Sequence, residues 1–484
     1  MKRLIYTLII AAFAITAFAF AALTNSAQAA SKGAYNNLTY EIINGKAVIT
    51  GYTKEPSGDL VIPEKIEGYS VTEIKADAFN GCLKIKSVSM PSVEYIGAGA
   101  FDFCENITKL ETPNVLTVYD YAFYGCGSLT EINLPKATMI GESAFGGWEE
   151  YPMNIKSISM PCAVSIGKYA FEFCSLLESI SAPNVKTIEK EAFNSCMSLK
   201  SIEFANAETI GEGAFSFCDS LADVKLPKVK TIDRFAFSNW NDHLLWALSE
   251  NTECPTSIKT VNIPSVQTIG EYAFYQCAEI ETLSIPNAIS IDTCAFAACY
   301  KLKSVSIPKA KKLCESAFYM CMELKNVDMQ NVETIETTAF YSCNLDRIDL
   351  YKVKSIGGWA FEENERLHAV YFYCDAPTEF GDGVFHYCAG DFTIYYAKGT
   401  KGWTTPEWNE YPAKEFEPLS GLGDLNDDNK VNTADAVVVL KASAGMITLD
   451  EQQTKSGDCN GDGMVNTADA VLILKYAAGM IYQF

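Results

Sequence analysis

Histidine, basic residues and long apolar runs are all scarce in this chain. Its 484 residues include three histidines, none in a metalloprotease, lipase-elbow or phosphate-loop motif: His243, His368 and His386. Lysine and arginine number 38 against 60 aspartates and glutamates, so the formal net charge is −22. An acidic chain of this kind is not expected to bind nucleic acid through its overall field. The carboxylates leave a glycosidase pair open, but we expect no enzyme because they occupy turns without a walled cleft.

A single long apolar run stands at the start of the sequence. It covers residues 4–23, two cations precede it, and Ala27-Gln28-Ala29 follows as a small-residue cleavage site. This arrangement predicts a secretory signal peptide over residues 1–29, and an uncleaved membrane span is the alternative. We therefore expect a secreted, extracellular chain without a membrane anchor. Cleavage removes two cations and no anions, which changes the net charge from −22 to −24.

The middle of the chain repeats with a period that is most often 22 residues. An Ala-Phe pair marks each unit, and Phe385 closes a degenerate fourteenth unit after phenylalanines 79, 101, 123, 145, 171, 193, 215, 237, 274, 296, 318, 340 and 361. Two longer intervals contain an insertion of four residues near 149–152 and one of fifteen within 241–257. A period of this length predicts a solenoid, in which each coil buries its apolar face against its neighbours.

One unit of the repeat shows how a coil is built. Val88 and Met90 alternate as expected for a short strand with an inward apolar side, and Pro91 ends that strand. Ala100 and Phe101 fill the third side of the coil. Glycine recurs before the Ala-Phe pair, where we expect a tight corner with an unusual backbone angle, at positions 97, 141, 167, 211, 270 and 357.

Seventeen cysteines would ordinarily suggest disulfides in a secreted protein. Eleven of them, however, follow the repeated phenylalanine by three residues, at 82, 104, 126, 174, 196, 218, 277, 299, 321, 343 and 388. Trp148, Trp240 or Asn364 replaces cysteine in other units, which indicates a buried packing position. Stacked coils point these side chains in parallel, which disfavours disulfide geometry. We predict a ladder of buried free thiols; a metal site is the alternative, although no two ladder cysteines share a short motif.

These repeats resemble the BspA-like, or treponemal-type, leucine-rich repeats. The matching unit reads Leu/Ile-x-x-Ile/Val-x-x-Pro-x-Val/Ala-x-x-Ile-Gly-x-x-Ala-Phe-x-x-Cys, and the resemblance covers about residues 61–385. It implies a curved, non-catalytic binding surface used in adhesion or protein recognition. We expect a mainly β fold, a leucine-rich-repeat solenoid of about 14 coils at residues 78–390.

Both ends of the repeats carry segments that read as caps, which a solenoid needs to protect its open ends. The first covers residues 30–77 and includes a predicted hairpin around Asn44-Gly45. The second covers residues 391–416, with Trp403 and Trp408 placed to cover the last coil.

Three parts of the repeat surface are candidates for recognition. The exposed side of the first strand carries a column of mostly small polar residues without anchoring aromatics, at Ser89, Glu111, Asn133, Ser159, Ser181, Glu203, Lys225, Asn262, Ser284, Ser306 and Asp328. A merely soluble face is the alternative. Aromatics directly before the Ala-Phe pair either stack on sugar rings or pack the coils, at Tyr121, Tyr169, Phe235, Tyr272 and Trp359. The insertion at 241–257 forms either a protruding contact loop or a segment folded on the flank.

The C-terminal end carries two near-copies of one acidic loop, whose first aspartates lie 34 residues apart. Oxygen side chains stand at positions 1, 3, 5, 9 and 12 of each loop, the ligand spacing of an EF-hand calcium loop. With the main-chain carbonyl of position 7, the predicted ligands are Asp424, Asn426, Asp428, Lys430, Asn432 and Asp435, and then Asp458, Asn460, Asp462, Met464, Asn466 and Asp469. A similar apolar helix follows each loop, at residues 436–441 and 470–475.

Two features argue against a calcium-buffering EF-hand pair. Asp replaces the usual Glu at position 12, and the short linker at residues 417–422 allows no helix before the first loop. The duplicated loop–helix, without a helix before it, resembles a type I dockerin, from Gly423 to about Met480 within a small all-α domain of residues 423–484.

The dockerin resemblance implies two Ca²⁺ ions and binding to a cohesin module of a scaffoldin, and so assembly into a cellulosome. It also implies cohesin contacts at Thr433, Ala434, Lys441, Thr467, Ala468 and Lys475. Because these residues are identical in the two halves, either half is expected to present the same face, rotated by half a turn.

Together the two resemblances imply a secreted repeat arm held in a cellulose-degrading complex by its dockerin. The arm is expected to recognise a protein or a plant cell-wall polysaccharide. A surface adhesin or spacer, and a dockerin-borne carbohydrate-active enzyme, are the alternatives.

Overall fold

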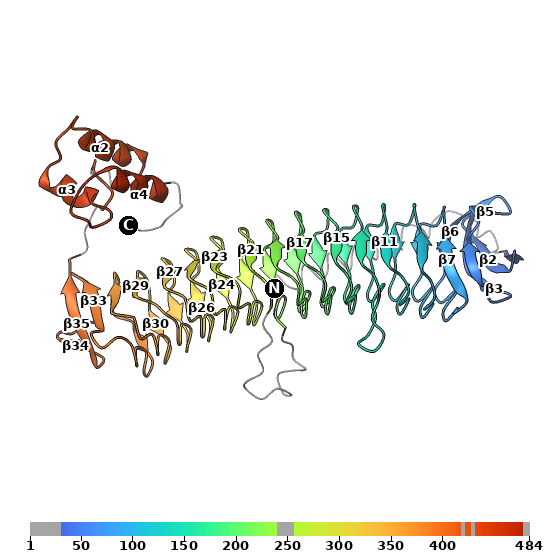
Figure 1. Cartoon of the computed structure of the whole chain (residues 1–484), viewed down its shortest axis with the longest axis horizontal. Helices are drawn as coiled ribbons and strands as arrows, with labels where there is room; N and C mark the ends of the chain where they lie inside the picture. Colours follow the sequence, from blue (N-terminus) through green and yellow to red (C-terminus); the bar gives the residue numbers. More distant parts are fainter. Residues whose placement is uncertain (1–30, 240–255, 418–421, 427–430, 478–484) are drawn as a thin grey trace.

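The computed structural model describes residues 31–239, 256–417, 422–426 and 431–477. The predicted signal peptide at 1–29 and nearly all of the insertion at 241–257, with Trp240 before it, lie outside these residues. A long solenoid occupies most of the described chain, and three short helices follow it (Figure 1). No helix in the described part of the chain is long and apolar enough to cross a membrane.

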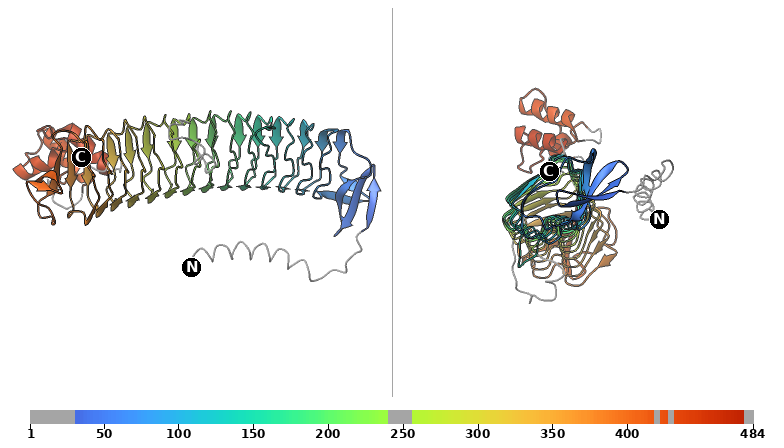
Figure 2. Two further views of the ribbon diagram at one scale, coloured as in Figure 1. Left: turned by 90° about the horizontal axis from the view of Figure 1, so that it is seen from below. Right: turned by 90° about the vertical axis from the view of Figure 1, so that its right-hand side faces the viewer.

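Two ladders of short parallel strands run along the solenoid. The first strands of the coils follow one another in a row and pair in parallel within five separate groups. These groups are β4 (Gly58–Val61), β7 (Ile85–Ser89) and β9 (Lys109–Glu111); β11 (Glu131–Asn133), β13 (Ser157–Ser159) and β15 (Ser179–Ser181); β17 (Ser201–Glu203), β19 (Asp223–Lys225) and β21 (Thr260–Asn262); β23 (Thr282–Ser284), β25 (Ser304–Ser306) and β27 (Asn326–Asp328); and β29 (Arg347–Leu350), β31 (Ala369–Phe372), β33 (Thr393–Ala397) and β35 (Tyr411–Phe416). Figure 2 shows that the stacked coils form a gentle arc.

The second strand of each coil is only two residues long, except in the first coil, where β6 has six residues. This ladder consists of β6 (Tyr69–Ile74), β8 (Tyr95–Ile96), β10 (Thr117–Val118), β12 (Met139–Ile140), β14 (Ser165–Ile166), β16 (Thr187–Ile188), β18 (Thr209–Ile210), β20 (Thr231–Ile232), β22 (Thr268–Ile269), β24 (Ser290–Ile291), β26 (Lys312–Leu313), β28 (Thr334–Ile335), β30 (Ser355–Ile356) and β32 (Glu379–Phe380). Its parallel pairing is continuous from β6 to β32. The described residues thus give fourteen second strands and sixteen first strands, so the solenoid has about 16 turns rather than about 14 because the cap segments add turns of their own.

The repeated phenylalanines form one continuous stack through the core. From Phe79 to Phe385, the ring centroids of neighbouring coils lie 4.9 to 5.6 Å apart and the rings are close to parallel. Offset stacking of this kind adds to the burial of apolar area. Each coil therefore depends on its neighbours for its largest buried side chain.

The cysteine ladder is free of disulfides in the described residues, as predicted, and all of its members except half-buried Cys388 are buried. Ten of the eleven thiols also have a polar role: from Cys104 onward, each donates a hydrogen bond to the carbonyl of the phenylalanine one coil before. The Cys104 Sγ lies 3.1 Å from the Phe79 oxygen, and the Cys196 Sγ lies 3.4 Å from the Phe171 oxygen. Burial raises the pKa of Cys104 to about 12, so the thiol keeps the proton that it donates.

The proposed substitutes for cysteine behave differently from one another. Asn364 is fully buried in the ladder, and its amide donates to the carbonyls of Phe340 and Phe361 at 2.8 and 2.9 Å. The prediction that Trp148 also takes a ladder position is wrong. The four-residue insertion directs its ring to the flank of the solenoid, where it stacks on Tyr124 at 5.6 Å. A hydrogen-bond donor, rather than bulk alone, is therefore what the ladder position requires.

The repeated glycines allow close packing of the coils rather than an unusual backbone angle. Gly97 and its counterparts do not have the unusual backbone angle that we expected. Instead, a Cβ at Gly97 would lie 2.5 Å from the main-chain nitrogen of Ala76 in the preceding coil, so the glycine permits close approach of two coils. The left-handed residues flank the phenylalanines and are mostly not glycine, as at Phe103 (φ 53°) and Tyr121 (φ 57°).

Antiparallel strands close the first end of the solenoid. β1 (Lys32–Tyr35), β2 (Leu38–Ile43) and β3 (Lys46–Tyr52) form a meander, with Asn44-Gly45 at the turn between β2 and β3, and β5 (Lys65–Ile66) pairs with β6. At the other end, β34 (Glu407–Trp408) pairs with β35. Trp403 and Trp408 pack there with ring centroids 4.7 Å apart.

The C-terminal helices form a second, small core. α2 (Thr433–Ser443) and α4 (Thr467–Ala477) pack together with the start of each acidic loop, and the two halves bury equivalent residues: Leu425, Ala436, Val439, Cys459, Ala470 and Ile473. Between them, α3 (Glu451–Gly457) leads directly into the second loop. The second half therefore does have a helix before its loop, in contrast to the duplicated loop–helix that the sequence suggested.

The ladder model predicts different costs for two replacements of Asn364. Asn364→Ala leaves two buried carbonyls and the Leu345 N–H, 3.2 Å from the amide oxygen, without their partner, which costs about 2–3 kcal/mol. Asn364→Cys restores a ladder thiol and should cost less than half as much. The midpoint of urea unfolding and hydrogen exchange near residues 340–361 measure the difference. Equal destabilisation by both variants would contradict a donor requirement.

Candidate functional site

The two C-terminal acidic loops are organised around a buried aspartate at position 12. Asp435 and Asp469 are both fully buried. Asp469 Oδ1 accepts hydrogen bonds from the N–H groups of Cys459 and Asn460 at 2.9 and 3.2 Å, and its Oδ2 accepts one from Asn466 at 2.9 Å. Asp435 makes the equivalent three contacts in the first loop. Each aspartate thus joins the start of its loop to the start of its helix.

Position 9 begins the helix in both halves. The Asn432 side chain caps α2 by accepting from the Ala434 N–H at 2.8 Å, and Asn466 accepts from the Ala468 N–H at the same distance. Asp435 completes a capping box with Asn432. The predicted ligand positions 9 and 12 therefore also determine where each helix starts.

The remaining ligand positions are best described in the second loop. Asp458 accepts from the Asp462 and Gly463 N–H groups at 3.1 and 2.8 Å, and the Asn460 Oδ1 accepts from the Asp462 N–H at 2.9 Å. Gly463 has the left-handed conformation expected at position 6 (φ 87°). The Met464 residue is exposed.

In the first loop, the described residues cover only part of the ligand set. Asp424 is buried and Asn426 is exposed, whereas Asp428 and Lys430 lie outside the described residues. In the described part of the chain, no three Asp, Glu, His or Cys side chains converge as a metal cluster.

The chemistry of the donors fits one kind of ion. The candidate side chains offer only carboxylate and amide oxygens, which suit hard Ca²⁺ rather than Zn²⁺. Burial of the anionic Asp435 and Asp469 is costly unless positive charge or donors compensate it, and a cation at the loop supplies such charge.

Both helices expose the same face. The residues predicted to contact cohesin are all exposed: Thr433, Ala434, Lys441, Thr467, Ala468 and Lys475. Four large apolar residues beside them are exposed too and were not among the predicted contacts: Val437 and Leu440 on α2, and Val471 and Leu474 on α4. Their spacing of four and seven residues from the threonines was the signal, because these positions share one helical face.

The polar column on the first strands ends differently from our expectation. Beyond Asp328, strand register places Asp349, Tyr371 and Tyr395 in one row across β29, β31 and β33. The guanidinium of Arg347 lies 3.9 Å from the centre of the Tyr371 ring and pairs with Asp349 at 2.7 Å. The column therefore does carry aromatic and arginine anchors at its C-terminal end, where the repeat length departs from 22 residues.

The aromatic residues before the Ala-Phe pairs do not form one uniform surface. Phe235 is buried and stacks on Tyr272 with ring centroids 5.4 Å apart. Tyr121 and Trp359 are exposed. Packing thus explains part of this set, and only its exposed members remain candidates for ligand contact.

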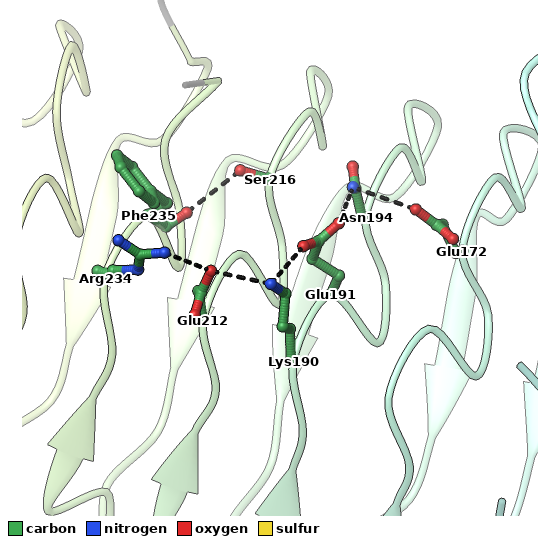
Figure 3. Close-up of polar contacts among 8 residues, drawn as sticks. All are labelled: Glu172, Lys190, Glu191, Asn194, Glu212, Ser216, Arg234 and Phe235. Atoms are coloured by element: carbon green, nitrogen blue, oxygen red, sulfur yellow. Dashed lines mark hydrogen bonds and ion pairs between the residues drawn. The ribbon is translucent and has the colours of Figure 1, made fainter. Parts of the chain in front are cut away.

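A polar network links four coils on the same flank (Figure 3). Glu212 pairs with Arg234 at 3.0 Å and with Lys190 at 3.1 Å, and Lys190 also reaches Glu191 at 3.4 Å. Asn194 donates from its amide to Glu191 at 2.9 Å and to Glu172 at 3.4 Å.

Glu172 lies at the end of that network without a basic partner in the described residues. Its burial, together with the nearby charge of Glu191, raises the pKa of its carboxyl to about 8. The carboxyl therefore carries a proton at neutral pH.

Comparison with known families and structures divides the chain in the same way. The BspA type leucine rich repeat region matches in six copies over residues 63–150, 150–245, 248–368 and 289–398, and the dockerin type I domain matches residues 422–477. These matches contain no enzyme domain. No curated protein matches the chain.

Among solved structures, a leucine-rich repeat protein from Bacteroides ovatus is 26% identical and superposes with a TM-score of 0.55 over 80% of this chain and 100% of its own. A T. pallidum leucine rich repeat protein is 28% identical, with a TM-score of 0.35 over 40% of this chain and 91% of its own. A leucine rich cell surface protein from Faecalibacterium prausnitzii is 20% identical, with a TM-score of 0.33 over 80% of this chain and 98% of its own.

Glu172 makes part of the stability depend on pH. An unfolded glutamate loses its proton near its ordinary pKa of 4.5, whereas the folded carboxyl keeps it to about 8, so stability falls as pH rises through this window. Glu172→Gln, which stays neutral, should flatten the decline in thermal midpoint between pH 5 and pH 8. The exposed Glu178→Gln serves as the matched control and should retain the wild-type slope. A wild-type slope in both variants would contradict the assignment.

Calcium removal should unfold the C-terminal helices and leave the solenoid intact. Chelation with EGTA is expected to abolish the α2 and α4 amide signals in NMR spectra, and added Ca²⁺ should restore them. Asp469→Asn lowers the ligand charge and should weaken calcium binding on the order of tenfold or more. The exposed Glu451→Gln should leave it unchanged. Isothermal titration measures both, and equal affinities would count against Asp469 as a ligand.

Proposed function

Because the chain belongs to the BspA-type leucine-rich-repeat family and ends in a type I dockerin domain, we propose that it is a secreted binding protein anchored in a cellulosome. A dockerin domain binds calcium and a cohesin, and this pairing assigns the C-terminal helices to attachment. The repeats are then free to act as the recognition arm. The duplicated loop–helix with its identical exposed faces is the observation that carries this proposal.

We assign one Ca²⁺ ion to each acidic loop. Side-chain oxygens at positions 1, 3, 5, 9 and 12, with the carbonyl at position 7, make up each ligand set. In the second loop the main-chain donors already gather Asp458, Asn460 and Asp462 within one turn. Calcium would replace part of this internal hydrogen bonding and hold the two helix starts in place.

Cohesin is assigned to the repeated helix face. Thr433 and Ala434 open α2, and Val437 and Leu440 continue their face with exposed apolar side chains. An apolar strip beside small and hydroxyl residues suits a protein interface whose core excludes water. The second helix repeats the strip, so a half-turn rotation presents an equivalent surface.

The arm is proposed to bind a protein or a cell-wall polysaccharide without transforming it. Its long stack of coils offers extended rows of side chains in parallel register, which suit the binding of an extended partner. A partner held by these rows would be carried to the complex in which the dockerin is seated.

The two-face assignment predicts a redundant cohesin site. Thr433→Arg with Ala434→Arg should leave cohesin affinity within about twofold of wild type, because the other half still binds. Adding Thr467→Arg and Ala468→Arg should weaken it on the order of 100-fold or more. Surface plasmon resonance with a cognate cohesin measures both, and calcium titration checks that the loops stay intact. A large loss from the first pair alone would show that only one face binds.

A further inference from the structure

Five aromatic rings gather on the flank of the solenoid where the four-residue insertion interrupts the period. We refer to them as the flank aromatic cluster: Phe103, Tyr121, Tyr124, Trp148 and Tyr151. The Trp148 ring lies 5.6 Å from Tyr124, 5.5 Å from Phe103 and 4.9 Å from Tyr151, measured between centroids. Figure 1 shows the loop that precedes β13 projecting from the edge of the solenoid.

The backbone is shaped to carry these rings. Trp148 and Tyr151 form an isolated antiparallel bridge, in which the Tyr151 N–H donates to the Trp148 carbonyl at 3.0 Å. Gly125 lies beneath the rings in the left-handed conformation (φ 66°). A Cβ at Gly125 would lie 3.2 Å from both Phe103 and Trp148, so a larger residue would disturb the cluster.

The cluster differs from the aromatic core in what its rings touch. The core phenylalanines stack in parallel and are covered on both faces, whereas Trp148 and Tyr151 are inclined by 50° and Phe103 and Trp148 by 62°. Tyr151 is 60% exposed. Phe103 and Tyr121 are exposed as well. Exposed apolar rings gathered from neighbouring coils into one patch mark an interaction site.

Carboxyl groups surround the cluster without basic partners. The Tyr121 hydroxyl donates to the Glu142 Oε1 at 3.0 Å. Burial raises the pKa of Tyr124, and the nearby charges of Glu172 and Asp102 raise it further. Two further carboxylates stand in the projecting loop, and none of the five forms an ion pair within the described residues: Asp102, Glu142, Glu149, Glu150 and Glu172.

Two of these carboxyl groups can still form hydrogen bonds: Asp102 has an oxygen without a partner, and Glu172 carries a proton. One oxygen of Asp102 is buried without a hydrogen-bond partner, and burial raises the pKa of Asp102 to about 6. Glu172 keeps its proton at neutral pH and meets only the amide of Asn194 among the residues drawn in Figure 3. Such groups exchange hydrogen bonds with hydroxyls without requiring an ionic partner.

This combination selects an uncharged, hydroxyl-rich ligand. The C–H face of a pyranose ring is apolar and slightly positive, so it packs against the negative face of an aromatic ring. Its hydroxyl groups point outward, where the surrounding carboxyl oxygens can accept them. Acidic polymers are disfavoured because like charges would meet at the cluster. The projecting position suits a chain lying across the rings rather than a small molecule enclosed in a pocket.

We propose that the flank aromatic cluster is a binding site for a neutral polysaccharide chain. Pyranose rings stack on Tyr151 and Trp148, and Glu142 and Glu172 hold their hydroxyls. This inference rests on the proposed role of the repeats as the recognition arm and narrows it to one place and one ligand class.

The full-length protein with bound calcium tests the proposal. Affinity electrophoresis and calorimetry with hydroxyethylcellulose and with mixed-linkage β-glucan should show binding, and polygalacturonate should bind at least about tenfold more weakly. Tyr151→Ala should reduce β-glucan affinity on the order of tenfold. Tyr387→Ala is the matched control, because Tyr387 is 73% exposed and lies far along the chain from the cluster. It should bind as wild type does.

Cohesin binding and the thermal midpoint are measured on the same variants. If cohesin affinity and the thermal midpoint are unchanged, a loss of glycan binding is local to the cluster. Phe103→Ala provides a second cluster variant in case Tyr151→Ala unfolds. Glycan binding that Tyr151→Ala and Phe103→Ala both leave intact would overturn the assigned site while the recognition arm stands. If neither neutral glucan binds, the proposed ligand class is wrong. The ligand class is also wrong if a lysine-rich peptide binds more tightly than the glucans and Tyr151→Ala abolishes that binding. Failure of the anchoring function would appear separately, as lost cohesin binding in the wild type.

Discussion

Stacking between neighbouring coils is the interaction on which the rest of this structure depends. A two-residue strand cannot form a stable sheet by itself, and a single coil cannot bury its phenylalanine. Successive coils solve both problems together, because parallel pairing from β6 to β32 aligns the rings of the core at spacings near 5 Å. The ladder thiols strengthen the same contact by donating to the carbonyls of the phenylalanines in the coil before. The caps then protect the two coils that have only one neighbour.

Departures from the regular period produce the distinctive surfaces. The insertion near residues 149–152 removes Trp148 from the ladder and assembles the flank aromatic cluster around it. In the last coils, Tyr351 and Tyr373 stand where most earlier coils have proline, and their rings stack at 4.6 Å beside the pair of Arg347 with Asp349. A regular solenoid repeats the same surface along its length, so recognition of one partner requires places where the repeat is broken.

The C-terminal helices are stabilised differently from the solenoid, because two copies of one short unit share a small core. Ala436 and Val439 of the first copy meet Ala470 and Ile473 of the second. Duplication leaves one equivalent face of each helix outside that core, including Val437 and Val471. The same symmetry that packs the domain therefore creates two exposed faces for a partner.

Much of this organisation could be predicted from the sequence because a solenoid converts spacing along the chain directly into position. The 22-residue period placed the phenylalanine core and the free thiols, and the duplicated loop identified the calcium-binding dockerin with helices α2 and α4 but not α3. The sequence did not predict the features that depend on contact between neighbouring coils. The glycine at 97 proved to allow close approach to Ala76, left-handed residues proved to flank the phenylalanines, and Trp148 proved to leave the ladder. The sequence by itself determined what repeats and what each repeat buries, since burial follows local periodicity. Only the tertiary structure decided which side chains meet on the surface, because those neighbours lie a full coil apart in the chain and are brought together by stacking.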